Sequence, residues 1–581
     1  MNHSSNHSSI NALIEKYPKL NDLNEFLEKK TGLSDFFKSN EEINRFKKFF
    51  TTLQHNQLKH RDMGDFQTPY LLTNRICAYL SHSGFNPDII IEPTVGSGTF
   101  IISSLHYFPS VRHIYCIELQ EKYEWHFKLN LLQYALEKTL STKIEFYRDN
   151  IFTHQLSSQF KEVLKHFKGQ ILIIGNPPWV TTAELSVLTS KNIPHKSNIK
   201  RDRGIEAMTG RGNFDIAEYI IIQMVKQFAD FPGKIAMLCK TSVIKNIVKN
   251  LANLGLRLSN LNALLVNSKE EFGISTEAAL LLADLTANFE LFCSIYNLYN
   301  PDVLLRKFGW TNNKFVSNID EYANYKYLDG VSPFTWRQGV KHDAIKVMVL
   351  SLNNGDLING YHEQVDIESA LLYPLLRGSD LKKPVIQTTK QHVILTQSSL
   401  GENTDYLRNK FPKLWSYLLK YAHILDSRKS NIYKNKPRFS IFGIGSYAFK
   451  PYKIAISGFY KNPNFVFIPP IESNPVMLDD TCYYLSFDEF NDAFFTWLFV
   501  QLPEVKKFLL SIVFLNSKRP YTKEILMRIQ LPKLIEVFSY EKLRAFYEDY
   551  VKSYYPLEFS QKDYLVYSQK FRLFSEKVAP D

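Results

Sequence analysis

Four short apolar runs in the first third of the chain constrain its fold most. They cover Ile89–Ile91, His113–Ile117, Lys143–Tyr147 and Ile171–Ile174, and a fifth run, Gly233–Cys239, follows later. Runs of this length and composition are typical of parallel strands that are buried on both faces of a sheet. The sequence therefore predicts an α/β fold built on a mostly parallel sheet.

An acidic residue follows three of these runs: Glu92, Glu118 and Asp149. The carboxyl ends of parallel strands meet at one edge of a sheet, so these acids are predicted to share one rim. A carboxylate at Glu118 can accept both hydroxyls of a ribose. Asp149 can accept from the amino group of an adenine while Ile151 or Phe152 packs on the ring. The pattern predicts a nucleoside site.

A glycine loop follows the first strand and leads into a helix from about Thr99. Gly96 and Gly98 allow the backbone to approach a ligand without interference from a Cβ atom. No Lys-Ser/Thr pair follows Gly98, which argues against a phosphate loop. The third glycine of the pyrophosphate fingerprint is also missing, so the loop is predicted to hold a different nucleoside ligand.

The fourth strand ends in Asn176-Pro177-Pro178-Trp179. The two prolines stiffen the backbone and leave its carbonyls free. The Asn176 side chain and the Pro177 carbonyl can together accept both protons of an amino group on a planar ring, with Trp179 stacked on that ring. The alternative is a plain turn, because Asn and Pro are common turn residues.

These motifs, in this order, resemble the amino-methyltransferases of DNA restriction–modification systems. The chain is most similar to the gamma arrangement of adenine-N6 methyltransferases, in which the target-recognition domain follows the catalytic domain. The resemblance is strong over about residues 60 to 290. It is carried by Gly64-Asp-Phe-Gln-Thr-Pro69, Glu92-Pro-Thr-Val-Gly-Ser-Gly98, Glu118, Asp149 and Asn176-Pro-Pro-Trp179.

The resemblance implies a seven-stranded Rossmann-like catalytic domain with S-adenosylmethionine as its cofactor. Glu92 and Thr94 depart slightly from the residues that such families often carry there, which leaves the cofactor prediction intact. A later segment, Glu270–Leu282, resembles the final antiparallel hairpin of this fold. In relatives an aromatic residue there stacks on the flipped base, which points to Phe272. The implied cofactor-binding residues are Thr68, Pro69, Glu92, Thr94, Gly96, Gly98, Glu118, Asp149, Ile151 and Asn176.

The implied substrate is an adenine flipped out of double-stranded DNA, methylated without a metal ion. The chain would then be the modification half of a type II restriction–modification system. A restriction endonuclease acting on the same site would be its counterpart, with no direct contact implied. Cytosine N4, RNA or a protein glutamine remain alternative substrates, and a non-catalytic DNA-binding relative is a further alternative.

The resemblance and the change of composition near residue 300 together suggest four parts along the chain. Residues 1–60 are predicted to form short helices, and 61–298 the catalytic domain. Residues 299–535 are enriched in Tyr, Asn, Lys and Phe and are predicted to form an α/β target-recognition domain. Residues 536–581 are predicted to be a helical segment. The first segment lacks the clustered acids of a nuclease, although a fused nuclease is not eliminated.

Clusters of basic residues are the candidates for contact with the DNA backbone, because Lys and Arg neutralise phosphates. One cluster lies in a polar stretch after the fourth strand, and two lie in the later domain, where aromatic residues are interleaved with them. Each cluster is alternatively an ordinary solvated surface. The candidates are Lys200, Arg201, Arg203, Arg428, Lys429, Lys434, Lys436, Arg438, Lys518 and Arg519.

The net charge of +12 and the pI near 9.0 favour a polyanionic partner. The five cysteines contain no C-x-x-C pair, which argues against structural zinc and a disulfide framework. No apolar run approaches the roughly 20 residues of a membrane span, and Met1–Ser9 lacks the pattern of a signal peptide. We therefore expect a cytoplasmic protein of a bacterium or archaeon.

Overall fold

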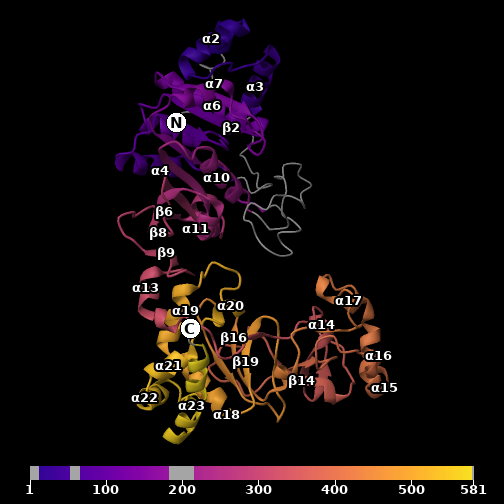
Figure 1. Cartoon of the computed structure of the whole chain (residues 1–581). Coiled ribbons are helices and arrows are strands. Elements are labelled where there is room, and N and C mark those ends of the chain that lie inside the picture. The colour runs from indigo at the N-terminus through magenta and orange to yellow at the C-terminus, as the bar shows by residue number, and fades with distance from the viewer. Residues whose placement is uncertain (1–11, 53–65, 182–214, 579–581) are drawn as a thin grey trace. The chain divides into compact units, whose positions relative to one another are not determined.

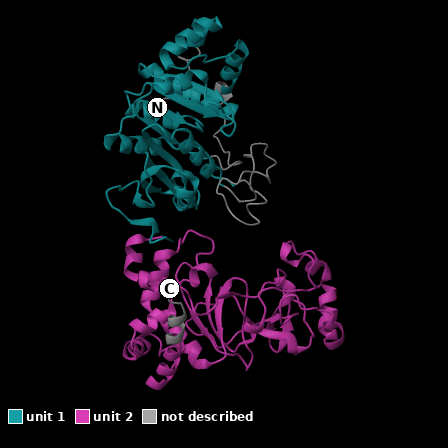
Figure 2. Ribbon diagram, in the orientation of Figure 1, with its two compact units in different colours: residues 1–315 teal, residues 316–581 magenta. Residues whose placement is uncertain are grey.

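The computed structural model describes residues 12–52, 66–181 and 215–578. The chain divides into two compact units, which we call unit 1 (Met1–Phe315) and unit 2 (Val316–Asp581) (Figure 2). Each unit has its own sheets and helices (Figure 1).

A large mixed sheet forms the centre of unit 1. Within the described residues its ten strands follow the order β10-β9-β8-β6-β7-β5-β4-β1-β2-β3. The strands are β1 (Ile89–Glu92), β2 (His113–Glu118), β3 (Lys143–Arg148), β4 (Ile171–Gly175), β5 (Gly233–Lys240), β6 (Leu258–Val266), β7 (Ala278–Leu285), β8 (Phe292–Asn297), β9 (Arg306–Thr311) and β10 (Lys314–Val316). The central strands are parallel, whereas β7 is inserted antiparallel between β5 and β6.

The order β3-β2-β1-β4-β5-β7-β6 confirms the predicted seven-stranded methyltransferase sheet. The sheet has three strands more than the seven predicted, because β8, β9 and β10 extend it beyond β6. Strand β8 pairs parallel with β6, and β9 pairs antiparallel with β8. Unit 1 therefore continues past residue 298, the predicted end of the catalytic domain, to Phe315.

The helices of unit 1 connect successive strands and pack beside one another. Helices α4, α5 and α6 pack in one row, which α2 extends, and α10 packs on α11. The helices are α2 (Leu20–Thr31), α3 (Asn40–Thr52), α4 (Tyr70–His82), α5 (Thr99–Tyr107), α6 (Glu121–Glu137), α7 (Ser158–Lys165), α10 (Ile216–Gln227), α11 (Thr241–Leu254) and α12 (Ser268–Phe272).

The N-terminal segment is joined to the edge of this sheet. Gly32 ends α2 with a left-handed backbone, and its carbonyl accepts a hydrogen bond from the Ile144 amide at 2.7 Å. A Cβ atom on Gly32 would lie 1.8 Å from the Thr142 carbonyl oxygen, so only glycine permits this approach. The described part of residues 1–60 therefore belongs to unit 1.

Unit 2 contains two smaller sheets. The four-stranded sheet follows the order β11-β19-β16-β17 and the five-stranded sheet the order β13-β12-β15-β14-β18 in the part of the chain that is described. Their strands are β11 (Arg337–Gln338), β12 (Val349–Asn353), β13 (Asp356–Ile358), β14 (Leu372–Leu376), β15 (Gln391–Ile394), β16 (Tyr452–Ser457), β17 (Val466–Ile468), β18 (Met477–Leu478) and β19 (Cys482–Phe487).

Each sheet of unit 2 packs against its own group of helices and has its own hydrophobic core. The four-stranded sheet packs on α18, α19, α21, α22 and α23, and the five-stranded sheet on α14 to α17 (Figure 1). A third cluster, which includes Leu376, Leu478 and Tyr484, joins the two sheets. The helices are α13 (Ile319–Tyr325), α14 (Ile345–Met348), α15 (Tyr406–Lys410), α16 (Pro412–Lys420), α17 (Ala422–Asp426), α18 (Phe490–Gln501), α19 (Pro503–Ile512), α20 (Lys523–Leu526), α21 (Leu531–Val537), α22 (Tyr540–Tyr550) and α23 (Gln561–Val578).

The predicted C-terminal helical segment, 536–581, is part of this packing, because Leu543 and Tyr547 of α22 lie in the core with α18.

All five cysteines are buried and free. Among the described helices, none has the length and apolar character needed to cross a membrane.

Candidate active site

A pocket of about 930 Å³, part of it open to solvent, lies at the carboxyl ends of β1 to β4 in unit 1. Parallel strands end at the same edge of the sheet, and their last residues therefore meet there. Nine of the predicted site residues line it: Thr68, Glu92, Thr94, Gly96, Glu118, Asp149, Ile151, Asn176 and Pro178.

Glu118 anchors the loop that follows β1. Its Oε2 atom accepts from the Gly96 amide and its Oε1 atom from the Gln120 amide, both at 2.8 Å. Gly96 has a left-handed backbone (φ 56°), and a Cβ atom there would lie 2.6 Å from the side-chain oxygen of Gln67. The same Gln67 oxygen accepts from the Ser97 amide. The loop is thus fixed from both sides of the pocket.

The second glycine of the loop has a different role. Gly98 also has a left-handed backbone (φ 77°), but a Cβ atom there would lie 2.3 Å from the ring of Phe127 on α6. Gly98 is not among the residues that line the pocket. It is required by the packing of α5 against α6. The place of both glycines beneath the cofactor stays a prediction.

Glu92 is a fully buried acid at the end of β1. Its Oε2 atom has no hydrogen-bond partner among the described residues. Burial raises the pKa of Glu92 well above its usual range, and the nearby charge of Glu118 raises it further. Glu92 is therefore an acid of this rim that is suited to carrying a proton.

Asp149 is fixed by two donors at the end of β3. Its Oδ1 atom accepts from the Asn150 amide at 2.7 Å, and its Oδ2 atom lies 2.8 Å from Nδ1 of His154. Burial raises the pKa of Asp149, but the bonds from His154 and Asn150 outweigh burial and leave the pKa below its usual range. The second ring nitrogen of His154 lies 2.7 Å from the Tyr115 hydroxyl.

Sequence reasoning did not find His154 or Tyr115. His154 follows Asp149 by five residues, a spacing with no periodic signal. Tyr115 lies inside β2 and looks like an ordinary core residue. Their contact depends on the pairing of β2 with β3, and only the assembled sheet brings the two rings together.

Asn176 has the most informative geometry in the pocket. Its Nδ2 atom donates to the Phe66 carbonyl at 2.9 Å and lies 3.2 Å from the Thr68 hydroxyl. A carbonyl oxygen can only accept, so the amide must turn its NH₂ group toward Phe66. The Oδ1 atom is buried and has no hydrogen-bond partner in the described part of the chain. An unsatisfied buried acceptor of this kind indicates a ligand donor.

Three aromatic rings gather beside Asn176. Trp179 and Phe272 lie 5.2 Å apart between ring centroids in an edge-to-face arrangement, which the sequence did not specify. Phe66 completes the group, at 5.7 Å from Trp179 and 6.1 Å from Phe272. The place of Phe66 among these rings was not predicted, although Phe66 lies within the motif Gly64-Asp-Phe-Gln-Thr-Pro69. The rings of Trp179 and Phe272 contact each other, and neither residue is among those that line the pocket.

The remaining motif residues support the pocket from the start of α4. The Thr68 carbonyl accepts from the Thr99 hydroxyl at 3.1 Å, which ties the motif to the start of α5. Pro69 caps α4 and does not line the pocket.

The candidate DNA-binding residues fall into three groups. Lys200, Arg201 and Arg203 lie outside the described residues. Arg428 and Arg519 are used inside unit 2, because the guanidinium of Arg428 donates to the carbonyls of Leu425, His342 and Ser440, and Arg519 pairs with Asp480.

Arg438 pairs with Asp426 at 2.7 Å. The other candidates, Lys429, Lys434, Lys436 and Lys518, are exposed.

The strand order and the pocket define unit 1 as an S-adenosylmethionine-dependent methyltransferase domain. The donor set fits the cofactor, because the rim offers carboxylates for hydroxyl and amino groups, and Ile151 and Phe152 offer an apolar wall for a ring.

Comparison with known proteins shows which methyltransferases the chain belongs to. The type II methyltransferase M.NspV of a Nostoc species is 37% identical over 491 residues, which are 83% of this chain and 99% of that relative. The chain belongs to the type II DNA methyltransferases of restriction–modification systems, and S-adenosylmethionine is its cofactor. No protein-family model matches the chain.

Two solved structures resemble the chain at low sequence identity. The restriction–modification enzyme MmeI in complex with DNA gives a TM-score of 0.46 at 12% identity, over 95% of this chain and 76% of that chain. The DrdV–DNA complex gives 0.42 at 11% identity, over 84% of this chain and 59% of that chain. The family assignment rests on the Nostoc relative.

Proposed function

We propose that this enzyme methylates the N6 amino group of an adenine in double-stranded DNA. The observation that carries the proposal is the orientation of Asn176, whose NH₂ group is fixed by Phe66 and whose buried Oδ1 atom has no partner among the described residues. An exocyclic amine donates hydrogen bonds and would satisfy this acceptor.

The exocyclic amine of adenine is a poor nucleophile, because its lone pair is delocalised into the ring. A hydrogen bond to Asn176 Oδ1 and a second to the Pro177 carbonyl withdraw its protons from the ring plane and leave electron density on the nitrogen. Pro177 and Pro178 fix the direction of the backbone there. S-adenosylmethionine, when bound, supplies an electrophilic methyl group. The residues then act mainly by positioning the amine, which contributes to the rate without a covalent intermediate.

The aromatic group explains how a base could be held outside the duplex. An adenine rotated out of the stack loses its neighbours, and rings of Trp179, Phe272 and Phe66 beside Asn176 can replace them. We assign Trp179 and Phe272 to stacking on the target base. Phe66 lies between them and the pocket, and its carbonyl orients Asn176.

The pocket residues divide between the parts of the cofactor. Glu118 accepts from the ribose hydroxyls, and Asp149 accepts from the adenine amino group, with Ile151 against its ring. Thr68 lies toward the methionine end, with Pro69 next to it at the start of α4 but outside the pocket lining, and Gly96 allows the loop to approach. A restriction endonuclease that cuts the same sequence would be the counterpart of this enzyme, without contact to it.

The test is to incubate the full chain with labelled S-adenosylmethionine and duplex DNA, and to identify the methylated nucleoside. We expect N6-methyladenine at one short sequence. The variant Asn176→Ala should lower transfer at least roughly 100-fold, because it removes an acceptor that acts on the reacting nitrogen. Its affinity for the cofactor, measured by calorimetry, should change only a few-fold.

The control is Asn250→Ala, which makes the same chemical change on α11, where the side chain of Asn250 bonds, among the described residues, only to the Asn246 carbonyl. It should transfer methyl groups at the normal rate. Label in N4-methylcytosine would replace adenine with cytosine, whose amine poses the same problem. Cofactor binding with no label in any DNA would instead indicate a non-catalytic DNA-binding protein.

A further inference from the structure

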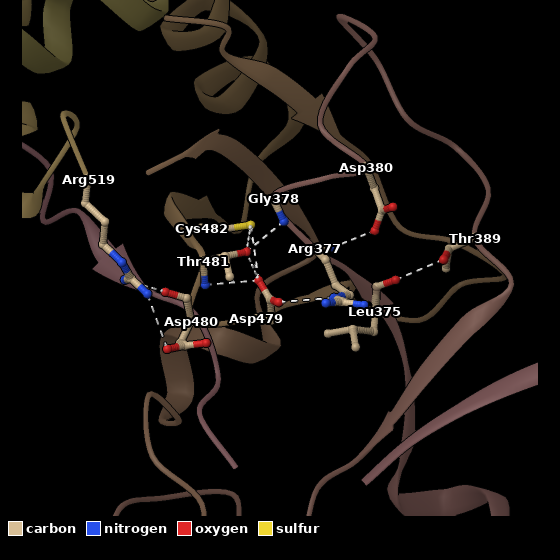
Figure 3. A network of polar contacts seen from close by, with 10 residues as sticks. All are labelled: Leu375, Arg377, Gly378, Asp380, Thr389, Asp479, Asp480, Thr481, Cys482 and Arg519. Atoms are coloured by element: carbon tan, nitrogen blue, oxygen red, sulfur yellow. Dashed lines mark hydrogen bonds and ion pairs between the residues drawn. The ribbon is translucent and has the colours of Figure 1, made fainter. Parts of the chain in front are cut away.

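The two sheets of unit 2 meet at a junction of polar side chains. These side chains do not belong to the pocket of unit 1. Arg377 follows β14, the last long strand of one sheet, and Asp479 to Thr481 form the turn that joins β18 to β19 of the other sheet (Figure 3). Beneath them, Leu376, Leu478 and Tyr484 pack in one cluster. The junction is therefore a rigid part of the unit.

Asp479 is fixed by its own turn. Its Oδ1 atom accepts from the Thr481 amide at 3.1 Å and also from the Thr481 hydroxyl. Its Oδ2 atom lies 3.5 Å from Nε of Arg377, which orients the guanidinium (Figure 3). Asp479 is buried, whereas the Arg377 side chain is 37% exposed. Its Nε atom is buried and makes no hydrogen bond among the described residues, so Asp479 holds it through charge alone. The pair thus supports the inner edge of the guanidinium.

The backbone around Arg377 is also fixed on both sides. The Asp479 amide donates to the Leu376 carbonyl at 3.1 Å, and the Gly378 amide donates to the Thr481 hydroxyl at 2.8 Å. The Arg377 amide donates to Asp380 Oδ2 at 2.7 Å. A side chain held in this way loses little conformational entropy when it binds a ligand.

Arg377 differs from three other arginines of unit 2 in which of its nitrogens remain available. Arg438 and Arg528 each pair with a carboxylate through a terminal nitrogen, and Arg519 does so with Asp480. The terminal nitrogens of Arg377 have no partner among the residues that the structure describes. Its guanidinium is therefore supported at Nε and unoccupied at the edge that carries most of its donors.

The surface next to this arginine is strongly basic. Segment 381–461 contains fifteen Lys and Arg and three Asp and Glu, so it carries a formal charge equal to that of the whole chain. Lys382, Lys461 and Lys506 line an open groove there. Two bonds tie this groove to the Arg377 loop, from the Tyr460 hydroxyl to the Ser379 carbonyl and from Asn464 to the Leu381 carbonyl. Such a surface attracts phosphates.

We propose that Arg377, oriented by Asp479, is a specificity-determining residue that donates from its two terminal nitrogens to O6 and N7 of one guanine in the recognition sequence. The major-groove edge of guanine presents two adjacent acceptors, which match the two donors of an arginine. The adjacent lysines would contact the phosphates on either side. The inference rests on the proposed action on duplex DNA and extends it to how the sequence is read.

The test begins with the methylated motif of the full-length enzyme, mapped by sequencing of treated genomic DNA. Duplexes that carry every single base-pair change of that motif are then compared by their methylation rates. For the natural enzyme, replacing one particular G·C pair should slow methylation by roughly 10- to 100-fold. In Arg377→Gln the penalty at that pair should fall to within about threefold, and the penalties at other pairs should persist.

Two further variants make the result interpretable. Arg377→Lys keeps a charge beside Asp479 and should fold even where Arg377→Gln does not. Its single nitrogen makes a weaker match, so the penalty at the same G·C pair should fall only partway. Arg544→Gln removes an arginine that pairs with Glu548 on α22, and it should keep every penalty of the natural enzyme.

Three results would overturn the assignment: a motif without a G·C pair, unchanged penalties in both Arg377 variants, or an equal loss of binding to all duplexes. The last would indicate a phosphate contact. If the natural enzyme methylates no DNA, the proposed function fails, and selection of bound duplexes from a random pool decides the inference alone. Guanine enriched at one position by the natural chain and not by Arg377→Gln supports it, whereas no such enrichment contradicts it.

Discussion

A carboxamide has two unlike ends, and the surroundings of Asn176 fix which end faces the pocket. The Phe66 carbonyl can only accept, so it determines the position of the NH₂ group. The acceptor end is left buried and unpartnered among the described atoms. An aspartate would place two acceptors there and would repel the Phe66 carbonyl, which is why an amide suits this position better than an acid.

A second residue with unusual surroundings is Lys453, in the middle of β16. Its side chain is fully buried, and its Nζ atom donates to the Lys450 carbonyl at 2.8 Å. Burial lowers the pKa of Lys453 to about 7. In the unfolded chain the pKa returns to about 10.4. Between these values the unfolded chain binds more protons, so the free energy of unfolding rises with pH there.

We therefore predict that the free energy of unfolding of Lys453→Met exceeds that of the natural chain by the largest amount at pH 7 and below. The advantage over the natural chain should shrink by roughly 2–4 kcal/mol as the pH rises to 10, because the natural lysine then no longer loses a proton on folding. Urea denaturation at several pH values measures it. Loss of the bond to Lys450 shifts all values equally, so a difference that does not change with pH would contradict the prediction.

At the level of elements, two glycines with similar backbones have different surroundings. Gly98 lies in the loop between β1 and α5, and Gly84 lies just after α4. Gly98 and Gly84 have nearly the same left-handed backbone, with φ values of 77° and 79°. A Cβ atom on Gly98 meets Phe127, whereas nothing lies within 4 Å of one on Gly84. The two positions therefore separate the effect of backbone strain from that of a steric overlap.

We expect Gly84→Ala to lower the free energy of unfolding by about 1 kcal/mol through the backbone alone. Gly98→Ala should lower it by about 2–4 kcal/mol, because the overlap with Phe127 is added. Chemical denaturation at neutral pH compares them, with Gly84→Ala as the matched control. Equal losses at the two sites would show that the ring of Phe127 moves aside easily.

The strands around the pocket could be predicted because their signals are local. Each is a short apolar run, and Glu92, Glu118, Asp149 and Asn176 stand where those runs end. The parallel arrangement then brings these ends together without further information. The bounds of β4, predicted as Ile171–Ile174, differ from the structure by one residue.

The parts that escaped prediction depend on pairing between distant segments. Strand β8 extends the sheet because it finds the free edge of β6, and nothing in Phe292–Asn297 itself reveals that partner. The contact of His154 with Tyr115 and the place of Phe66 among the aromatic rings arise in the same way. Arg428 looked like a surface residue in a basic cluster, yet its guanidinium bonds to carbonyls of its own unit.

At the scale of the molecule, the positive charge is concentrated in one segment of unit 2. Lys429, Lys434 and Lys436 are exposed. We predict that changing all three to Gln weakens binding to duplex DNA regardless of sequence. The slope of log K against log salt concentration should become shallower by roughly 2 to 3, since each phosphate contact contributes about 0.9. Fluorescence anisotropy at several salt concentrations measures it.

Lys413 and Lys420 supply the control, because they lie in the same segment but pair with Asp366 and Glu363. Changing both to Gln should leave the slope nearly unchanged. A slope that responds equally to the two sets of substitutions would mean that the charge of the segment acts as a whole and that no particular lysine contacts a phosphate.

The chain passes from unit 1 to unit 2 once, between Phe315 and Val316. The hydrophobic clusters of unit 2 contain only residues that follow this point. In evolutionary terms, one recombination event at the corresponding codons exchanges everything from α13 onward and leaves the inherited pocket intact. Under the proposal that unit 2 reads the DNA sequence, such an exchange gives the enzyme a new recognition sequence and leaves the residues of its pocket unchanged.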